Sequence, residues 1–168
     1  MNLLLANCEL LRQGIQLLSR HDDRTFVTTD PASYGSGIGA HFRHVLDHYR
    51  SFLEGVGAGF IDYDNRERDT IEERELSAAL ASMTELARRM EEAEVDVESL
   101  VRVKVCASTE GEDLHSVSSL GRELQFLVSH TVHHYALIAI ASRLQGIFPE
   151  DGFGVAPSTL KFLSSVRP

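Results

Sequence analysis

Residues 120–140 read LGRELQFLVSHTVHHYALIAI and carry the strongest helical pattern in the chain. Apolar residues recur there at intervals of three and four, a spacing that places them on one side of a helix. They are Leu120, Leu124, Leu127, Leu137 and Ile138, and Ala141 continues the pattern just beyond this stretch. We predict a helix from about Ser119 to Gln145, with Gly146 as its C-cap.

Three other segments share this periodicity and are predicted to be long helices. They run from about Asn2 to Arg20, from Ser36 or Gly37 to about Gly55, and from Thr70 to about Met90. Glu73 follows Thr70 at the spacing of a capping box. Four long helices that each have one apolar side bury those sides best against one another. The sequence therefore predicts an all-α fold, a four-helix bundle, in a single domain of residues 1–168.

The periodicity changes between the third and fourth of these helices. Valine alternates with charged residues over Val101–Val105, the pattern of a half-buried strand. A turn at Glu110–Gly111 leads to a weaker strand over Asp113–Val117, so we predict a small β-hairpin between the two helices. A short helix is predicted over Ser158–Ser165. The glycine-rich segment Asp151–Pro157 before it is expected to cover one end of the bundle, with a lid over the functional site as the alternative.

Composition excludes several classes of protein. A formal net charge of −9 argues against nucleic acid or an anionic membrane as partner, because phosphate binding needs a basic surface. The longest apolar run, Tyr135–Ala141, is too short to span a bilayer, and the N-terminus lacks the basic region of a secretory signal. Cys8 and Cys106 are the only cysteines and show no Cys-x-x-Cys spacing, which argues against a thiolate zinc site. We expect a cytoplasmic protein.

Histidine is the residue that points to chemistry. Six of the eight histidines fall in two short windows: His41, His44 and His48 in the second helix, and His130, His133 and His134 in the fourth. His130 and His134 lie one turn apart, so both rings can converge on one metal ion, whereas His133 is expected to face outward or form a hydrogen bond. The three histidines of the second helix lie within about 60° of arc. Any of them could supply a third nitrogen, and their position relative to the apolar side slightly favours His41 or His48.

Three other interpretations fit these segments less well than a metal site formed by histidines. They are buried histidines without a metal, a peptidase motif and a calcium-binding loop. A lone histidine on an apolar face is usually a buried residue held by hydrogen bonds, but two clusters on facing helices would bury several imidazoles that each need a partner. Thr131 stands where the HExxH motif of metalloproteases has its glutamate, which disfavours peptidase chemistry. The segment Phe60–Asp69 lacks the glycine of a calcium loop and is predicted to be a solvated loop.

The two histidine windows, GIGAHFRHVLDHYRSFL (residues 37–53) and residues 120–140, resemble the DinB-like (DinB/YfiT) superfamily of metal-binding four-helix bundles. The resemblance covers most of the chain and rests on His-x-x-Asp in the second helix and His-x-x-x-His in the fourth. It implies His44, His130 and His134 as ligands of a divalent ion, zinc or nickel, with His48 as the main rival of His44. It makes Asp47 a candidate for orienting a ligand, and it implies a homodimer.

The family includes transferases and an isomerase that depend on low-molecular-weight thiols, whose pKa a metal ion lowers on binding. The resemblance therefore implies a metal-dependent enzyme of thiol S-transferase or hydrolase type with a small-molecule substrate. Candidates for binding the carboxylates of such a thiol are Arg43, Arg50, Arg122 and Arg143. One alternative is a non-catalytic metal-binding or stress-response module in which the ion is structural. Another is a helical dimerisation domain without a metal.

Overall fold

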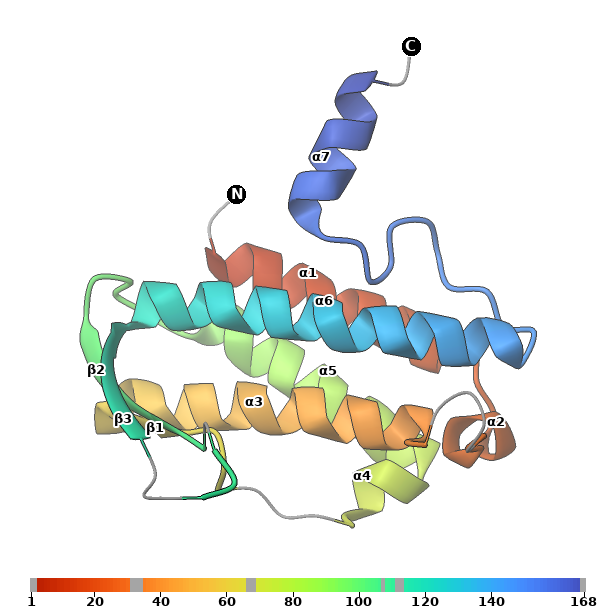
Figure 1. Cartoon of the computed structure of the whole chain (residues 1–168), viewed down its shortest axis with the longest axis horizontal. Coiled ribbons are helices and arrows are strands. Elements are labelled where there is room, and N and C mark those ends of the chain that lie inside the picture. Colours follow the sequence, from red (N-terminus) through yellow and green to blue (C-terminus); the bar gives the residue numbers. More distant parts are fainter. Residues whose placement is uncertain (1–2, 31–34, 66–68, 107, 111–113, 167–168) are drawn as a thin grey trace.

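The computed structural model of the chain describes residues 3–30, 35–65, 69–106, 108–110 and 114–166. This part of the chain is mostly helical, with a small three-stranded sheet at one end (Figure 1). The helices are α1 (Leu3–Leu18), α2 (Asp23–Val27), α3 (Ile38–Ala58), α4 (Ile71–Arg74), α5 (Leu76–Glu92), α6 (Leu120–Leu144) and α7 (Pro157–Val166). The strands are β1 (Phe60–Asp62), β2 (Leu100–Val105) and β3 (Leu114–Ser119).

The four longest helices, α1, α3, α5 and α6, enclose the core. Helices α1 and α3 each pack against both α5 and α6. Their apolar sides are buried, as the helical spacing predicts, and the largest fully buried side chains include Tyr49, Tyr135, Phe42 and Phe52. Helices α1 and α6 approach so closely that a Cβ at Gly14 would clash with the hydroxyl of Tyr135. Periodicity alone therefore predicts this helical core correctly.

The sheet has the strand order β1-β2-β3. Strands β2 and β3 pair antiparallel, with Val103 opposite Ser116, which confirms the predicted hairpin. Residues 111–113, which include part of the predicted turn and Asp113, lie outside the described residues. Val101 and Val103 are buried on the side that faces the helices. The hairpin is therefore attached to the core through its valine side chains, as the alternating pattern indicates.

Strand β1 corrects the prediction of a solvated loop over Phe60–Asp69. It pairs parallel with β2 and places Ile61 opposite Val103. Ile61 and Tyr63 are only 0% and 3% exposed, so this segment contributes to the core. The strand has three residues and its partner lies some forty residues later, so no local pattern of useful length marks it.

The predicted third helix is divided in two. Glu75 has φ −120° and ψ 115°, an extended conformation that separates α4 from α5. The capping box expected from Thr70 and Glu73 does not form, because Thr70 makes no capping hydrogen bond. The carboxylate of Glu73 instead accepts a hydrogen bond from Arg43 Nε at 2.5 Å. A contact with α3 thus replaces the local cap.

Two other helix boundaries differ from the prediction. A capping box forms at Asp22 and Thr25 and starts the short helix α2, which the sequence pattern did not reveal. Helix α3 continues past Gly55 to Ala58 and ends at Gly59, whose φ of 68° is accessible to glycine at little cost. In contrast, α6 begins and ends as predicted, with Ser119 accepting a hydrogen bond from the backbone N–H of Arg122.

The segment before α7 packs against α6 on the side that faces α1. The ring of Phe153 stacks on Tyr135 with centroids 4.4 Å apart, and the hydroxyl of Tyr135 donates to the carbonyl of Leu10 in α1. The segment therefore covers the α1–α6 groove and not the histidines, so the alternative of a lid is wrong. None of the helices in the described part of the chain combines the length and hydropathy needed to cross a bilayer.

Candidate metal centre

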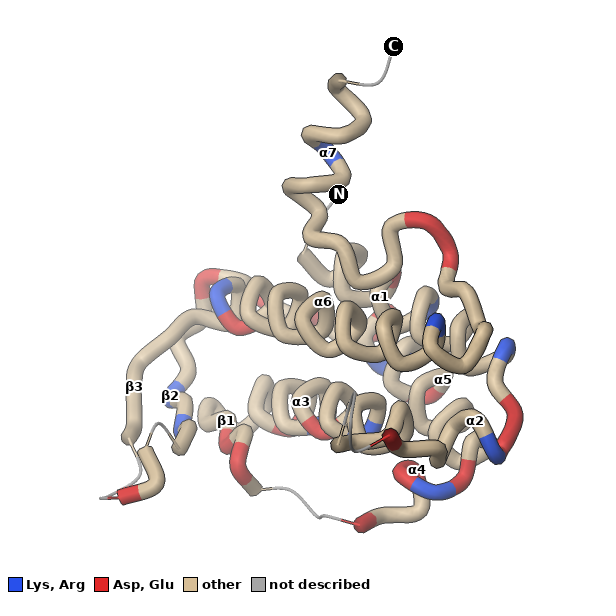
Figure 2. The backbone as a smooth tube through the Cα atoms, turned by 45° about the vertical axis from the view of Figure 1, so that its right-hand side comes forward, with Lys and Arg blue, Asp and Glu red and all other residues tan. Residues whose placement is uncertain are grey.

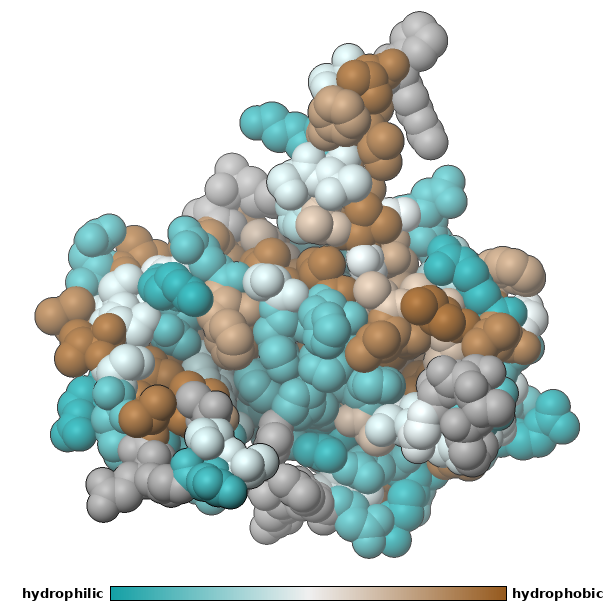
Figure 3. All heavy atoms as spheres, viewed as in Figure 1, coloured by the Kyte–Doolittle hydropathy of each residue, from teal (hydrophilic) through white to brown (hydrophobic). Residues whose placement is uncertain are grey.

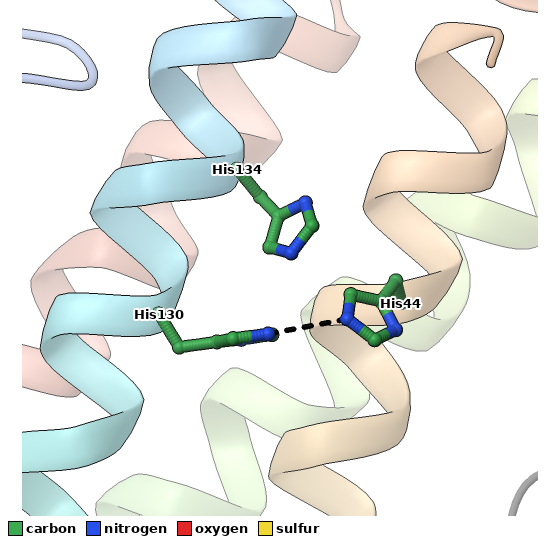
Figure 4. A group of neighbouring side chains, drawn as sticks. All are labelled: His44, His130 and His134. Atoms are coloured by element: carbon green, nitrogen blue, oxygen red, sulfur yellow. Dashed lines mark hydrogen bonds between the residues drawn. The ribbon is translucent and has the colours of Figure 1, made fainter. Parts of the chain in front are cut away.

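Three of the predicted histidines meet between α3 and α6. His44 comes from α3, and His130 and His134 come from successive turns of α6. Figure 4 shows all three side chains pointing into the space between the two helices. All three are partly exposed. Hydrophilic side chains gather on this face of the molecule, between the ribbons of α3 and α6 (Figure 3).

The distances between the ring nitrogens fit a metal ion. Each histidine offers one nitrogen, and these three nitrogens lie within 4.8 Å of one another. Nε2 of His44 and Nε2 of His130 are 3.2 Å apart. Two nitrogens that bind one tetrahedral zinc ion at 2.0–2.1 Å are about 3.4 Å apart. The spacing of this pair is already close to that of two ligands of one ion.

His41 supports His134 from α3. Their Nδ1 atoms are 3.1 Å apart, so one of them donates a hydrogen bond to the other. Burial, together with the nearby His133, lowers the pKa of His41, which favours a neutral ring that can accept. In Figure 4 the other ring nitrogen of His134 faces the gap between His44 and His130. This is the usual arrangement of a metal-binding histidine, whose second nitrogen is held by a neighbour.

His48 lies beside the three histidines but outside the converging group. Its ring stacks on that of His130, with centroids 3.8 Å apart and planes at 22°. Its Nδ1 donates to the carbonyl oxygen of His44 at 2.9 Å, since a carbonyl can only accept. His133 is exposed, as expected. Periodicity alone slightly favours His41 or His48, whereas the structure brings His44 together with the α6 pair.

Two aromatic residues that the sequence did not point to complete the surroundings. Tyr63 stacks on His48 with ring centroids 5.1 Å apart, and Phe126 lies 5.5 Å from His130. Phe126 precedes His130 by four residues, so helical spacing could have placed it there. Tyr63 could not be found in this way, because its segment is predicted to be a loop.

Tyr63 is itself held by a buried carboxylate. Its hydroxyl donates to Glu123 at 3.0 Å, and the hydroxyl of Ser118 donates to the other oxygen of Glu123 at 2.6 Å. Burial and the negative charge of Glu123 raise the pKa of Tyr63 well above its usual range. Tyr63 therefore stays neutral and fixes one wall of the histidine cluster.

The other face of α3 carries ion pairs. Asp47, the candidate for orienting a ligand, accepts from Arg43 at 2.8 Å and from Arg50 at 3.5 Å. Arg43 also pairs with Glu73, and Arg50 with Glu72 at 2.6 Å. Burial opposes ionisation of Glu72, but its hydrogen bonds and the charge of Arg50 lower its pKa to about 2. Arg43 and Arg50 thus pair with carboxylates of the protein itself, which removes them as candidates for binding the carboxylates of a thiol.

The two remaining candidate arginines lie on α6. Arg122 borders a cavity of about 200 Å³ whose walls include Tyr63, Phe126 and Val103. Because Tyr63 and Phe126 also contact the histidines, this cavity adjoins the candidate metal centre. Arg143 is exposed in the last turn of the helix. Arg122 is therefore the better placed of the two.

Comparison with known proteins gives one partial match. No family model matches the chain, and no solved structure matches it at a significant level. Over 107 residues the chain is 30% identical to "FK506-binding protein 5" of Rhizopus delemar. The match covers 61% of this chain and 27% of that protein, so the chain spans about a quarter of the relative's length.

Proposed function

We propose that the chain is a DinB-like four-helix-bundle protein that binds one divalent ion, zinc or nickel, through His44, His130 and His134. The observation that carries this proposal is the convergence of three imidazole nitrogens within 4.8 Å. Imidazole suits both metals. The packing of α1 and α3 against α5 and α6 is compatible with such a bundle. The resemblance of the two histidine windows to the DinB-like superfamily adds further support.

We propose that the centre is catalytic and of thiol S-transferase or hydrolase type. Three protein nitrogens leave coordination positions for water or a thiol, and a bound ion lowers the pKa of either. The three histidines are partly exposed, which a small-molecule substrate or thiol requires. Arg122, at the adjoining cavity, could receive a carboxylate of that molecule. His48, Tyr63 and Phe126 would form the wall against which it lies.

The second candidate is a structural ion in a non-catalytic or stress-response module. One observation favours it: the three histidines come from two different helices, so an ion would fasten α3 to α6. Such an ion binds only the folded state and stabilises it by that preference. The two candidates differ in whether a ligand from solution reaches the ion.

Cobalt(II) as a spectroscopic probe separates these candidates. Purified metal-free protein is titrated with cobalt(II), and 2-mercaptoethanol is then added to the loaded protein. We expect tetrahedral cobalt absorption and, after the thiol, a new near-ultraviolet band from thiolate bound to cobalt. Bound cobalt with no change on adding thiol would favour the structural ion. Absence of cobalt binding in wild type would overturn the metal site. His133→Ala, which changes an exposed neighbour, is the matched control.

Further parts of the proposal rest on sequence. The net charge of −9 supports a protein without nucleic-acid or anionic membrane partners, and the resemblance supports a cytoplasmic homodimer. We do not extend FK506 binding to this chain, because the match spans only 27% of the protein that carries that name.

A further inference from the structure

Helix α7 extends away from the rest of the protein, as Figures 1 and 2 show from two directions. None of its residues is buried. Its large apolar side chains are 39–63% exposed: Leu160, Phe162, Leu163 and Val166. An isolated helix shorter than about 12–15 residues is marginal in water. This ten-residue helix therefore needs a packing surface. Within the described part of the chain, Leu160 and Leu163 border only the segment that precedes the helix, and Phe162 and Val166 stay 63% and 56% exposed.

The base of α7 is firmly attached. Phe153 is 6% exposed and stacks on Tyr135. Gly154 has φ +72° and lies so close to α6 that a Cβ would clash with the backbone of Ala136. Arg20, two residues after the end of α1, pairs with Glu150 at 2.7 Å. These contacts fix the point at which the chain leaves the helical core and enters α7, so packing determines where α7 starts.

A second exposed apolar surface lies on α6. Leu137, Ile140 and Leu144 are 38%, 55% and 60% exposed, and their spacing places them on one side of the helix. We call these three residues the α6 stripe. Figure 3 shows hydrophobic side chains over this C-terminal half of α6. Ile140 lies about 140° around the helix from Tyr135, where the base of α7 is attached. Phe153 thus packs on a different side of α6 from the stripe. Gly154 lies against Ala136, one turn before Ile140, so the base of α7 borders the stripe but leaves it exposed.

Both surfaces lack acidic residues, although the chain carries 25 of them. No aspartate or glutamate occurs between Leu124 and Pro149, or after Asp151. Figure 2 shows α7 and most of α6 without acidic positions. Two copies with a net charge of −9 repel each other wherever acidic surfaces meet. The α6 stripe and α7 are therefore surfaces through which a second copy can approach without that repulsion.

We infer that α7 of each copy packs on the α6 stripe of a second copy, in a two-fold symmetric exchange. The helix has one lysine, Lys161, and no arginine within Pro157–Val166. Helices that lie on membranes are rich in basic residues, so a lipid surface fits this helix poorly. The inference specifies the contact surface of a homodimer and does not depend on the metal centre.

Molar mass measured by light scattering over a range of protein concentrations tests the exchange. We expect wild type at twice the mass of one chain. Phe162→Asp on α7 and Ile140→Asp on the stripe each place a charge in the interface, and each should raise the dissociation constant at least about tenfold. Val117→Asp is the matched control, because Val117 is 71% exposed but lies on β3. It should remain dimeric, and circular dichroism checks that every variant is folded.

Mixing the two variants separates exchange from pairing of α7 with α7. A heterodimer of Phe162→Asp with Ile140→Asp keeps one intact contact between α7 and a stripe. We therefore expect the mixture to associate more tightly than either variant alone. Dimeric Ile140→Asp would overturn the exchange, and so would wild type that stays monomeric throughout. A third outcome would assign α7 to a lipid surface instead. In that case wild type is monomeric and sediments with phosphatidylglycerol vesicles, whereas Phe162→Asp does not sediment with them.

Discussion

Helix α3 carries two polar clusters, one on each side, and they are built in opposite ways. Toward α4 and α5, Asp47 and its neighbours form ion pairs in which each charge meets an opposite charge at 2.5–3.5 Å. Toward α6, imidazoles face imidazoles: His44 meets His130, and His41 meets His134. The first cluster is complete within the protein. The second brings bases together at the spacing of ligands, which is the arrangement that a cation completes.

This difference separates a cluster that stabilises the fold from a cluster that can bind a metal ion. Opposite charges at low exposure fix α3 against its neighbours, and removing one partner leaves a buried charge. Ring nitrogens 3.2 Å apart share at most one hydrogen between them, so a metal ion can take its place. The two clusters should therefore respond differently to mutation, metal and pH.

The largest expected effect comes from breaking the ion pairs. Asp47→Ala removes a carboxylate that is 9% exposed and leaves Arg43 without one of its two partners. We expect a loss of about 3–5 kcal/mol in the free energy of unfolding, measured by urea denaturation of metal-free protein. Asp47→Asn, which keeps a hydrogen-bond acceptor, should lose less. A loss below about 1 kcal/mol would mean that this cluster does not hold the fold.

The next effect comes from adding metal to the histidine cluster. Zinc at a free concentration one hundred times its dissociation constant should raise the free energy of unfolding by about 2.7 kcal/mol, because only the folded state binds it tightly. Thermal denaturation with and without a chelator measures this. Asp47→Asn should keep the gain, since it changes only the ion pairs. An equal gain in His134→Ala would contradict the assignment of that ligand.

A smaller effect is expected from pH, through a histidine outside both clusters. His21 contacts Ser142 at 3.1 Å and Thr25 at 3.2 Å, and burial lowers its pKa below 6.5, although Asp22 opposes this. As the pH falls, His21 is therefore protonated in the unfolded chain at a higher pH than in the folded protein. The free energy of unfolding consequently decreases as the pH falls through 6.5 and is fully present above it. In metal-free protein His21→Gln should show a shallower pH dependence. An equal or steeper dependence would contradict the direction of the shift.

The smallest effect is expected at the exposed member of the histidine windows. His133→Ala should change the free energy of unfolding by no more than about 0.5 kcal/mol, since it alters an exposed side chain. Chemical denaturation in the presence of zinc measures this against wild type. If zinc no longer raised the free energy of unfolding of this variant, His133 would belong to the metal centre, and the histidine cluster would have a different set of ligands.

The features that the sequence predicted are those with local causes. Helix α6 repeats its apolar pattern over many turns and has a serine cap, so its bounds were found. The spacing of His130 and His134 places them together for the same reason. The rotation of α3 about its axis depends on packing against four other helices, so periodicity could not choose among its histidines. The DinB-like resemblance, and not periodicity, pointed to His44.

The features that were missed depend on contacts distant in sequence. Strand β1 exists because β2 pairs with it across some forty residues. The break at Glu75 accompanies the pairing of Glu73 with Arg43, a residue of another helix. Tyr63 reaches the histidines only because β1 carries it there. Local patterns do not record such contacts, which is why the walls of the site were invisible in the sequence.

The most direct test of the metal centre is the metal content of protein purified without a tag, measured by mass spectrometry with inductively coupled plasma. We expect a stoichiometric divalent ion in wild type and in His133→Ala, and its loss in His44→Ala and His130→Ala. Loss in His130→Ala with retention in His44→Ala would move the third ligand to His48 or His41. Wild type that stays free of metal, even after incubation with zinc or nickel, would contradict the metal centre altogether.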